Sequence, residues 1–346
     1  MECGSRTLKA MTNTHPQTEG TVSPDIIFQL AQGFMASKHL FAASELGLFE
    51  ALGEGPVDLA GLAARTGLTP RTARISADAM VALGLLECRA GCYANTPVAA
   101  AFLSGATPAD MRPLLKFWDR LSYPVWTDLA GALGRGRPTR QVFDIDETLV
   151  PIMSAGIEAA TAAACRALPA AAGLPPASQV LDIGGGTGSW TIALAQADPN
   201  LTGTVFELPE VAAVAEERLR TAQLSSRVSV VAGDLLVDHL PGGHNAFLLA
   251  NVVHYFTPET NQSILRHIRT VAEPGAGLLL ADFWTDPTHT QPLPAALMAG
   301  EFAIHVNDGD VYSVEEAAAW LGATGWSHTG NAPLAGPISL VTAEAA

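Results

Sequence analysis

The spacing of hydrophobic positions along the chain changes near residue 176. Before it, apolar side chains recur at helical spacing between small residues, as Ile75, Ala79 and Leu83 do at positions i, i+4 and i+8. After it, short apolar runs alternate with helical stretches. The runs predict strands over residues 180–183, 204–208, 228–232, 247–253 and 278–283. Helices are predicted from about residue 189, from residue 209 and through residues 264–268, so the expected fold class is α/β, with a doubly wound parallel sheet covered on both faces.

The helical half of the chain contains a predicted hairpin. Two or three closely packed helices are expected over residues 24–52. Asp58 and Pro70 each begin a further short helix, and residues 85–95 predict a hairpin that turns at residues 90–91. This order of helices and hairpin is typical of a winged helix, a module that reads DNA or serves as a packing and dimerisation scaffold.

These patterns divide the chain into four segments. Residues 1–23 are polar and are expected to form a disordered tail. Residues 24–105 are the expected winged-helix domain, and residues 106–175 are a helical linker whose aromatic bulk is expected to wall a substrate site. Residues 176–346 are the expected Rossmann-like catalytic domain.

Charge and cysteine content disfavour several classes of protein. The chain carries 34 acidic and 19 basic residues, and a net charge of −15 repels phosphate backbones, so no nucleic-acid partner is expected. No apolar run reaches the ~18 residues of a membrane span, and the polar start lacks the apolar core of a secretory signal. The four cysteines are too scattered for a disulfide framework, so a reducing cytoplasm is the expected compartment; they are Cys3, Cys88, Cys92 and Cys165.

A glycine-rich loop lies between the first predicted strand and its helix. In Asp182-Ile-Gly-Gly-Gly-Thr-Gly188, Gly184, Gly186 and Gly188 are spaced by two, and such glycines let backbone amides approach a ligand at the helix N-terminus. Dinucleotide loops have the spacing Gly-x-Gly-x-x-Gly and bind a pyrophosphate, which the acid at 182 would repel. The loop instead resembles the methyltransferase form, in which the amino and carboxylate groups of S-adenosylmethionine take the place of the pyrophosphate.

Two further acids follow the next two strands. Glu207 ends the second strand about twenty residues beyond the glycines, where a carboxylate can accept both ribose hydroxyls. Asp234 follows the third strand, placed to accept from an adenine amino group while Leu235 packs on the ring. Three acids at successive strand ends around one glycine loop indicate a single nucleoside site. The expected cofactor contacts are Asp182, Gly184, Gly186, Glu207, Asp234 and Leu235.

Nearly the whole chain resembles the large family of S-adenosylmethionine-dependent O-methyltransferases that includes plant caffeate enzymes and bacterial polyketide and hydroxyindole enzymes. The resemblance rests on Ala36-Ser-Lys-His-Leu40, Leu46-Gly-Leu-Phe-Glu-Ala51, the strand and loop of residues 180–188, and Gly233-Asp-Leu-Leu236. It implies a winged-helix dimerisation domain, a homodimer whose partner subunit contributes to the substrate pocket, and a C-terminal catalytic domain. The implied reaction is methyl transfer to a hydroxyl of a small aromatic or polyketide-like secondary metabolite.

The same resemblance assigns the catalytic residues. His254, in Asn251-Val-Val-His-Tyr-Phe256, matches the family's general base. Chemistry agrees, because a hydroxyl must lose its proton as it attacks the sulfonium methyl, and imidazole titrates near working pH. Asp282 matches the first of two acids that hold the base, but the second falls on Val311, and Tyr255 and Phe256 stand where the family usually has aspartate and tryptophan. The system that orients the base is therefore expected to be incomplete, and some bacterial members rely mostly on proximity.

Other activities stay open at this stage. His305 resembles the second histidine of iron-dependent phenylpyruvate C-methyltransferases, with His254 matching the first, and two imidazoles with a bidentate keto acid suit iron. Some relatives bind S-adenosylmethionine without transferring its methyl group. A winged-helix regulator that senses the cofactor is a further alternative, and it predicts salt-dependent DNA binding. The leading hypothesis needs no metal.

The substrate pocket is expected to draw its walls from the helices between residues 111 and 153 and from residues 283–306. The candidate substrate contacts are Trp118, Tyr123, Met153, Asn251, Phe302 and His305.

Overall fold

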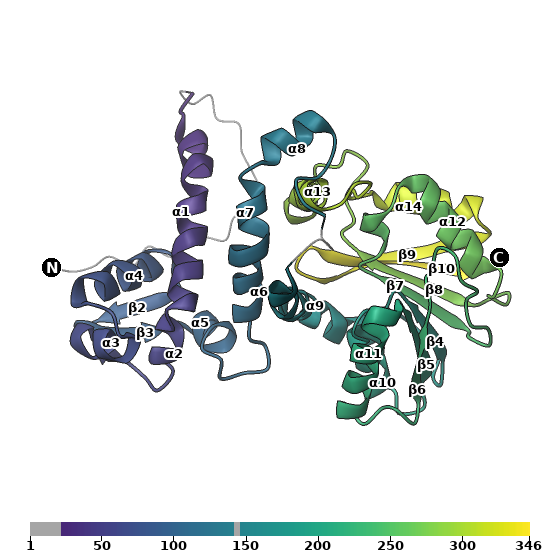
Figure 1. Ribbon diagram of the computed structural model, residues 1–346, viewed down its shortest axis with the longest axis horizontal. Helices are drawn as coiled ribbons and strands as arrows, with labels where there is room; N and C mark the ends of the chain where they lie inside the picture. The colour runs from purple at the N-terminus through teal and green to yellow at the C-terminus, as the bar shows by residue number, and fades with distance from the viewer. Residues whose placement is uncertain (1–21, 142–145) are drawn as a thin grey trace. The chain divides into compact units, whose positions relative to one another are not determined.

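The chain folds into two compact units, Met1–Arg120 and Leu121–Ala346, as seen in a computed structural model that describes residues 22–141 and 146–346 (Figure 1). The boundary between the units lies inside the segment expected to be a helical linker. The expected disordered tail, residues 1–23, and Cys3 with it, lies outside the described residues except for its last two positions.

The N-terminal unit begins with the helices that the apolar spacing predicts. A long helix, α1 (Asp25–Glu45), is followed by the short α2 (Leu48–Ala51), α3 (Leu59–Thr66) and α4 (Pro70–Ala82). The Asp58 side chain accepts a hydrogen bond from the backbone N–H of Gly61 and so caps α3, and Thr69 caps α4, in which Pro70 fills the first turn. The helix starts predicted at Asp58 and Pro70 are therefore confirmed.

The hairpin predicted for residues 85–95 is also present. Strands β2 (Leu86–Arg89) and β3 (Cys92–Asn95) pair antiparallel around Ala90 and Gly91, whose φ angles of 52° and 82° are those of a type I′ turn. The two-residue β1 (Val57–Asp58) pairs with β3, and α5 (Pro97–Phe102) and α6 (Arg112–Phe117) follow. Fully buried Leu48, Phe49, Leu62 and Met80 centre this unit's core.

A series of helices leads into the C-terminal unit. A π-helical turn, η1 (Trp118–Ser122), precedes α7 (Tyr123–Trp126) and α8 (Leu129–Arg135). Gly136, with φ of 61°, ends α8. After the short turn η2 (Glu147–Leu149), α9 (Val150–Ala171) runs to the start of the sheet.

The C-terminal unit is built on one seven-stranded sheet with the order β6-β5-β4-β7-β8-β10-β9. The five predicted strands are present as β4 (Gln179–Ile183), β5 (Thr202–Glu207), β6 (Val228–Ala232), β7 (Ala246–Ala250) and β8 (Gly277–Asp282), and they pair in parallel. The last two strands, β9 (Trp326–Ala335) and β10 (Ile338–Ala345), were not predicted. They form a hairpin whose β10 pairs antiparallel with β8, so the sheet is mixed at this edge.

Helices cover both faces of the sheet, as predicted. Alternate residues of each strand point to opposite faces, so Leu181 and Leu278 enter one core while Val180 and Leu279 enter the other. The first core is closed by α12 (Pro258–Arg269) and α14 (Val314–Ala323), and the second by α9, α10 (Ser189–Ala197) and α11 (Pro209–Thr221). In the described ranges, no helix is both long and apolar enough to cross a membrane.

Candidate functional site

The glycine loop lies at the carboxyl end of β4, where the strand order reverses between β4 and β7. Ligands of doubly wound sheets bind at such a point. Gly184, Gly186 and Gly188 all have positive φ, at 68°, 55° and 78°, and Gly188 is the N-cap of α10. A Cβ atom on Gly184 would lie 2.9 Å from Val252 Cγ2, whereas one on Gly186 would meet nothing within 4 Å. The loop therefore leaves open space beside the backbone N–H groups that begin a helix.

Glu207 ends β5 beside this loop. Its Oε2 accepts a hydrogen bond from the backbone N–H of Gly186 at 2.7 Å, and its Oε1 accepts from the N–H of Leu208 at 2.7 Å. The carboxylate is thus held at the loop and only partly buried. Each oxygen keeps a further lone pair, which is what acceptance from a pair of ribose hydroxyls requires.

The turn after β6 contains Asp234 and Leu235, and it lies close to Gly184. The Asp234 side chain accepts from the N–H of Leu236 at 2.8 Å, which fixes the turn. The Leu235 side chain lies near Gly184, since a Cβ atom there would be 3.6 Å from Leu235 Cδ2. Three strand ends therefore converge on one place, although the predicted adenine contacts of Asp234 and Leu235 stay predictions.

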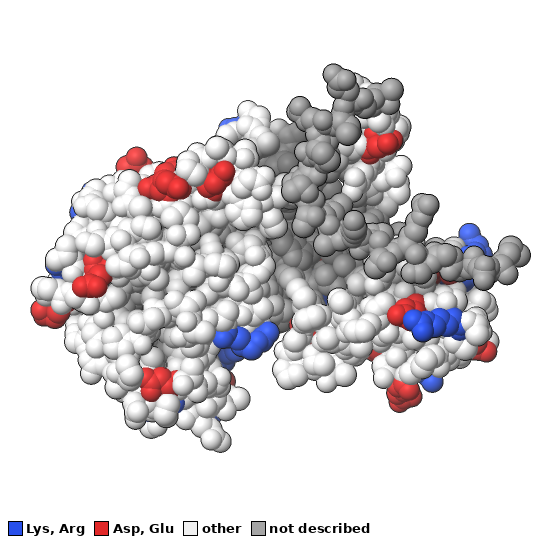
Figure 2. All heavy atoms as spheres, turned by 180° about the vertical axis from the view of Figure 1, so that it is seen from behind, with Lys and Arg blue, Asp and Glu red and all other residues white. Residues whose placement is uncertain are grey.

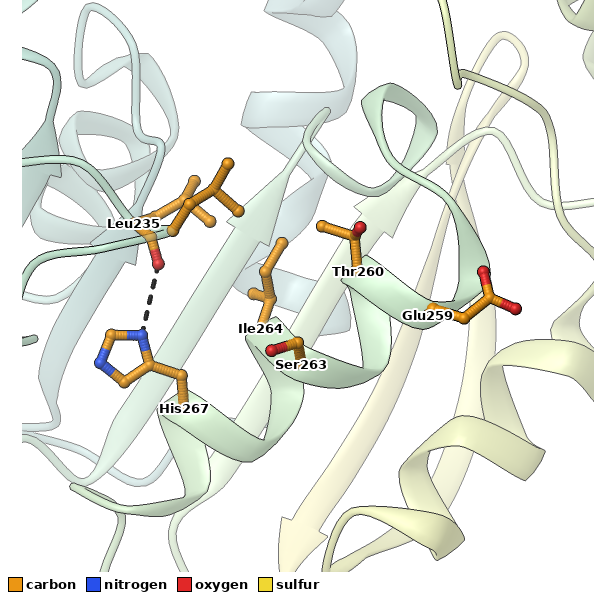
Figure 3. Close-up of a pocket in the computed structure, with 7 residues that line it drawn as sticks. Leu235, Glu259, Thr260, Ser263, Ile264 and His267 are labelled. Carbon is orange, nitrogen blue, oxygen red and sulfur yellow. Dashed lines mark hydrogen bonds between the residues drawn. The ribbon is translucent and has the colours of Figure 1, made fainter.

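Helix α12 supports this turn from outside. The His267 ring donates from Nδ1 to the Leu235 carbonyl oxygen at 3.3 Å, as Figure 3 shows. Beside this bond is a hollow of about 430 Å³ between the turn and α12. Its lining is formed by Leu235, Leu236, Glu259, Thr260, Ser263, Ile264 and His267. Because the backbone of Leu235 is tied to α12, the turn is held in place before any ligand binds.

Asp182, the acid that precedes the glycines, lies beneath the loop. It is fully buried, accepts a hydrogen bond from Thr191 Oγ1 at 2.7 Å, and leaves its Oδ1 without a partner. Burial, with the negative charge of Glu207 added, raises the pKa of Asp182 to about 7 against the effect of the Thr191 bond. This position suits support of the loop, and direct contact of Asp182 with the cofactor remains a prediction.

The raised pKa of Asp182 predicts a pH dependence of folding stability. The folded chain binds this proton more tightly than the unfolded chain, so the stabilisation is complete below the ordinary carboxyl pKa near 4 and is lost as the pH rises through about 7. The loss is on the order of 4 kcal/mol. Asp182→Asn, which keeps an acceptor for Thr191, should remove this pH dependence of stability. Urea unfolding of both proteins from pH 4.5 to 8 measures the difference, and two parallel curves would reject this assignment.

His254 follows the end of β7, which lies between β4 and β8 in the sheet. β7 stops at Ala250, three residues earlier than predicted, because Asn251 takes a left-handed φ of 56° and the chain then forms the 3-10 turn η3 (Val253–Tyr255). This turn brings His254 over the end of β8, where its Nδ1 donates to Asp282 Oδ1 at 2.7 Å. Both side chains are almost fully buried. Since Nδ1–H is used by Asp282, Nε2 is the nitrogen that can take up a proton.

Asp282 is itself fixed by backbone donors. Its Oδ2 accepts from the N–H of Val253 at 3.0 Å, and its Oδ1 accepts from the N–H of Phe283 at 2.8 Å. These bonds fix the carboxylate, which in turn orients the ring that donates to it. The predicted pairing of His254 with Asp282 is therefore present in the structure.

Apolar packing surrounds His254 where the family resemblance predicts a second acid. The Phe302 ring stacks on the His254 ring, with centroids 4.0 Å apart and planes 15° from parallel. Val311, at the position of the missing acid, is 2% exposed and packs in one cluster with Phe302. Tyr255 follows His254 in the chain, and burial, together with the charges of Asp282, Glu207 and Glu301, raises its pKa to about 12. Its hydroxyl therefore keeps its proton.

Two other candidate contacts lie near His254 in sequence or structure. Asn251 directly follows β7, and its Oδ1 is buried without a hydrogen-bond partner. His305 ends α13 (Leu293–His305), one turn after Phe302. Left-handed backbone at a residue other than glycine, with an unsatisfied buried oxygen, is typical of a functional position.

Glu301, which is buried on α13, was not among the predicted site residues. Its Oε2 accepts from Ser122 Oγ at 2.7 Å and from Trp126 Nε1, and its Oε1 lies 3.3 Å from His305 Nε2. The available signal was an acid and a histidine four residues apart in a helix that is otherwise apolar.

The remaining candidate substrate contacts are more scattered. Trp118 belongs to the N-terminal unit, where its ring packs edge-on against Phe117. Tyr123 begins α7 and Met153 lies on α9, both partly buried in the C-terminal unit. Substrate contact by these three residues stays a prediction. Within the described ranges, no three His, Cys, Asp or Glu side chains lie close enough together to hold a metal ion.

Comparison with protein-family models matches both units. Residues 28–105 match an O-methyltransferase dimerisation domain, and residues 133–327 match an O-methyltransferase domain. The match to the catalytic domain covers the glycine loop, the three strand-end acids and the His254–Asp282 pair.

Individual relatives are similar over nearly their whole length. The 3-hydroxy-5-methyl-1-naphthoate 3-O-methyltransferase of Streptomyces sahachiroi is 33% identical over 320 residues, which are 91% of this chain and 92% of the relative. The tetracenomycin polyketide synthesis 8-O-methyl transferase TcmO of Streptomyces glaucescens is 29% identical over 92% of this chain and 95% of its own. The crystal structure of human N-acetylserotonin methyltransferase in complex with S-adenosylmethionine superposes with a TM-score of 0.80 at 25% identity, covering 97% of this chain and 99% of that chain.

Proposed function

The chain belongs to the O-methyltransferase family that pairs a dimerisation domain with an S-adenosylmethionine-dependent catalytic domain. We propose that it methylates a phenolic hydroxyl of a small aromatic or polyketide-like substrate, with His254 as general base. The observation that carries the proposal is the buried His254–Asp282 pair at the edge of the sheet where the glycine loop also lies.

The residues at the strand ends fit S-adenosylmethionine. Open space at Gly186 suits the methionine end of the cofactor, and the half-buried Glu207 carboxylate offers acceptors to its ribose. Leu235 and Val252, which flank Gly184, give an apolar wall for the adenine. When bound, S-adenosylmethionine supplies a methyl group already activated on a sulfonium sulfur. The protein therefore has to place the substrate hydroxyl and remove its proton.

His254 is suited to remove that proton. Asp282 fixes the tautomer with the hydrogen on Nδ1, so Nε2 offers a lone pair, and the negative charge of Asp282 stabilises the imidazolium that forms. Phe302 and Phe283 pack against the ring and leave it little freedom to rotate. Asp282 and the aromatic contacts together take over the orienting role that two acids have in most of the family.

The chemistry of the substrate is inferred from the surroundings of His254 and from the relatives. Aromatic rings border the base, which favours a flat aromatic substrate. The two Streptomyces relatives are named for a naphthoate and for a polyketide. On the face drawn in Figure 2, the Lys and Arg side chains of the described residues form no continuous track, which agrees with a small-molecule partner.

A substrate panel tests this function. The full-length protein is incubated with S-adenosylmethionine, a metal chelator and hydroxynaphthoates, naphthols and aromatic keto acids, and S-adenosylhomocysteine and methylated product are both quantified by mass. We expect equal amounts of the two with a phenol and none with a keto acid. Turnover that needs added iron and a keto acid would overturn the proposal. The names of the two Streptomyces relatives, both O-methyltransferases, do not favour that reaction.

We further propose that the chain is a homodimer through α1. This helix leaves a row of large apolar side chains exposed, with Ile27 66%, Leu30 73% and Phe34 50% exposed, and Ile26, Phe28 and Met35 beside them. Isolated exposed apolar residues are ordinary, but a continuous row on one helix indicates a partner. The dimerisation-domain match covers residues 28–105 and so includes most of this row, which supports a second copy of the chain as the partner of this face.

Charges placed in this row should separate the subunits. Each such side chain contributes roughly 1.5–3 kcal/mol when buried, so Leu30→Glu combined with Phe34→Glu should raise the dimer dissociation constant at least about 100-fold. Sedimentation velocity measures the change. Val214→Glu, at a valine 47% exposed on α11, is the matched control and should leave the dimer intact. A double variant that stays dimeric at nanomolar concentration would place the interface elsewhere.

The proposed compartment is a reducing cytoplasm. Cys88, Cys92 and Cys165 are unpaired, and no disulfide joins any of the described residues.

A further inference from the structure

The turn η3, which carries His254, is held through its backbone carbonyl groups. Asn261, 3% exposed on α12, donates from Nδ2 to the carbonyl oxygens of Val253 at 3.0 Å and Phe256 at 3.1 Å. The His254 carbonyl oxygen accepts from the backbone N–H of Asp310 at 3.1 Å. Buried backbone groups of folded proteins are nearly always paired, and here the partners belong to other segments of the chain. The turn is therefore fixed in place from outside.

One of these segments, residues 309–312, lies between α13 and α14. Tyr312 Oη donates to the Phe256 carbonyl oxygen at 2.6 Å. Burial, with the negative charge of Asp310 added, raises the pKa of Tyr312, so the hydroxyl keeps its proton and is the donor of this bond. The Tyr312 ring packs edge-on against Trp320 of α14, with centroids 4.8 Å apart. The hydroxyl thus reaches the turn from a ring that α14 holds.

Gly309 is where this segment comes closest to the backbone of His254. A Cβ atom at Gly309 would lie 2.5 Å from the His254 carbonyl oxygen and 2.9 Å from Cβ of Val306. Both distances are far below the ~3.5 Å of ordinary contact between non-bonded atoms. Neither neighbour is the end of a flexible side chain, so neither can swing away. Glycine is therefore required if the next N–H, that of Asp310, is to reach the same carbonyl oxygen.

The segment is anchored beside the acid that binds the base. The N–H of Thr285, three residues beyond the end of β8, donates to the Tyr312 carbonyl oxygen at 3.0 Å, and the N–H of Val314 donates to the Thr285 carbonyl oxygen at 3.1 Å. Asp282 is the last residue of β8 and accepts from Nδ1 of His254. The ring and the backbone of His254 are thus both held from the end of this strand.

We propose that Gly309 and Tyr312 are positioning residues for the general base, which hold the backbone of η3 so that Nε2 of His254 keeps one place while Asp282 binds Nδ1. This proposal rests on the proposed function, since it takes His254 to be the base. Val311, between the two residues, stands where the family resemblance predicts an acid. The segment therefore holds the base through its backbone, without a second carboxylate.

Kinetics of the full-length protein with S-adenosylmethionine and a hydroxynaphthoate tests the proposal. Gly309→Ala displaces the His254 carbonyl, and since a 1 Å misplacement can cost about 100-fold, it should lower kcat by about 10–100-fold. Tyr312→Phe, which keeps the ring and removes one hydrogen bond, should lower kcat by about 3–10-fold. KM for the naphthoate and the dissociation constant of S-adenosylhomocysteine should stay within about twofold of wild type in both variants.

Two matched variants control for the substitutions themselves. Gly322→Ala adds the same methyl group on α14 at a position where a Cβ atom meets nothing within 4 Å. Tyr93→Phe removes a hydroxyl that donates to Asp78 in the N-terminal unit. Both should keep kcat within about twofold of wild type. If Gly309→Ala and Tyr312→Phe do the same, the proposal is wrong.

A double-mutant cycle shows whether Gly309 acts through the base. When His254 is already alanine, Gly309→Ala should lower kcat by less than about twofold further, because the group that it displaces is gone. A merely structural role predicts the same loss with and without the imidazole. An equal loss in both backgrounds would therefore overturn the proposal.

The Nδ1–H proton of His254 reports the same geometry without turnover. In protein that contains ¹⁵N-labelled histidine and is saturated with S-adenosylhomocysteine, this proton is assigned by its absence in His254→Ala. Because it bridges to Asp282, its chemical shift follows the length of that hydrogen bond. We expect the signal to shift in Gly309→Ala and to keep its place in Gly322→Ala.

The two readouts separate the failure of this proposal from that of the proposed function. A signal that keeps its place in Gly309→Ala would overturn the positioning role, even if His254→Ala abolishes methyl transfer. A signal that shifts in Gly309→Ala, in a protein whose His254→Ala variant transfers methyl groups at the wild-type rate, would support the positioning of His254 and count against its role as base.

Discussion

His254→Ala is expected to lower kcat by about 10²–10⁴ at neutral pH while S-adenosylmethionine binds within about threefold of its wild-type affinity. The loss follows from removing the group that takes the hydroxyl proton, since Asp282 Oδ1 is 2.7 Å from Nδ1 and holds the ring with Nε2 available. Cofactor binding should not change, because the glycine loop and Glu207 lie on other strand ends. Single-turnover kinetics with a saturating phenol measures the chemical step directly.

The pH dependence of the same variant separates base catalysis from a structural effect. Phenols ionise near pH 10, so a rising pH supplies the phenolate that His254 otherwise generates. The difference in kcat between wild type and His254→Ala should therefore become smaller from pH 7 to pH 10. A loss that stays constant over this range, or one smaller than about threefold at pH 7, would show that proximity to the activated methyl group suffices and that His254 is not the base.

Glu207→Ala is expected to weaken S-adenosylhomocysteine binding by at least about 100-fold. A carboxylate that accepts from two ribose hydroxyls makes two charge-assisted hydrogen bonds, each contributing about 1.5–3 kcal/mol. The variant also loses the bond from the Gly186 N–H, which holds the loop against the end of β5. Glu207→Gln keeps an acceptor for that bond and should lose less affinity for S-adenosylhomocysteine. Isothermal titration calorimetry gives the dissociation constants.

The neighbouring Glu210 provides the control for this experiment. It is exposed in the first turn of α11, three residues beyond Glu207, and Glu210→Gln removes the same charge. That variant should bind S-adenosylhomocysteine with a dissociation constant within about twofold of the wild-type value, since exposed charges contribute little. Equal affinity in wild type and Glu207→Ala would place the ribose elsewhere and would separate this chain from the cofactor geometry proposed above.

The parts of the fold that sequence predicted are those governed by local chemistry. Strands β7 and β8 are buried on both faces and are nearly unbroken apolar runs, so they were visible as strands in the sequence. Turn and cap residues located the hairpin at Ala90–Gly91 and the start of α3 at Asp58. The positive φ angles of Gly184 and Gly186 agree with the glycine spacing from which the loop was inferred.

The parts that sequence did not predict depend on tertiary contacts. Val252 and Val253 extend the apolar pattern of β7, but Asn251 adopts a left-handed conformation and turns the chain so that His254 reaches Asp282. β9 alternates weakly and carries Pro333, and it is recognisable as a strand only through its pairing with β10. No local pattern signals either event.

Within the site, the pairing of Glu301 with Ser122 and Trp126 joins positions more than 170 residues apart. Only the Glu301–His305 spacing was visible in one sequence. The family pattern likewise showed that Val311 replaces an acid, but it could not show that Phe302 stacks on the base beside it. The resemblance therefore predicted the pairing of His254 with Asp282 and missed the stacking of Phe302 on the His254 ring.

In the proposed reaction the methyl group goes to oxygen and His254 takes the proton. The most direct test supplies S-adenosylmethionine labelled with ¹³C in the methyl group, together with a hydroxynaphthoate and a metal chelator, and reads the labelled carbon of the product by NMR. We expect a methoxy carbon formed in equal amount with S-adenosylhomocysteine, and formed much more slowly by His254→Ala. A methyl carbon bonded to ring or side-chain carbon, or label that remains wholly on the cofactor, would contradict it.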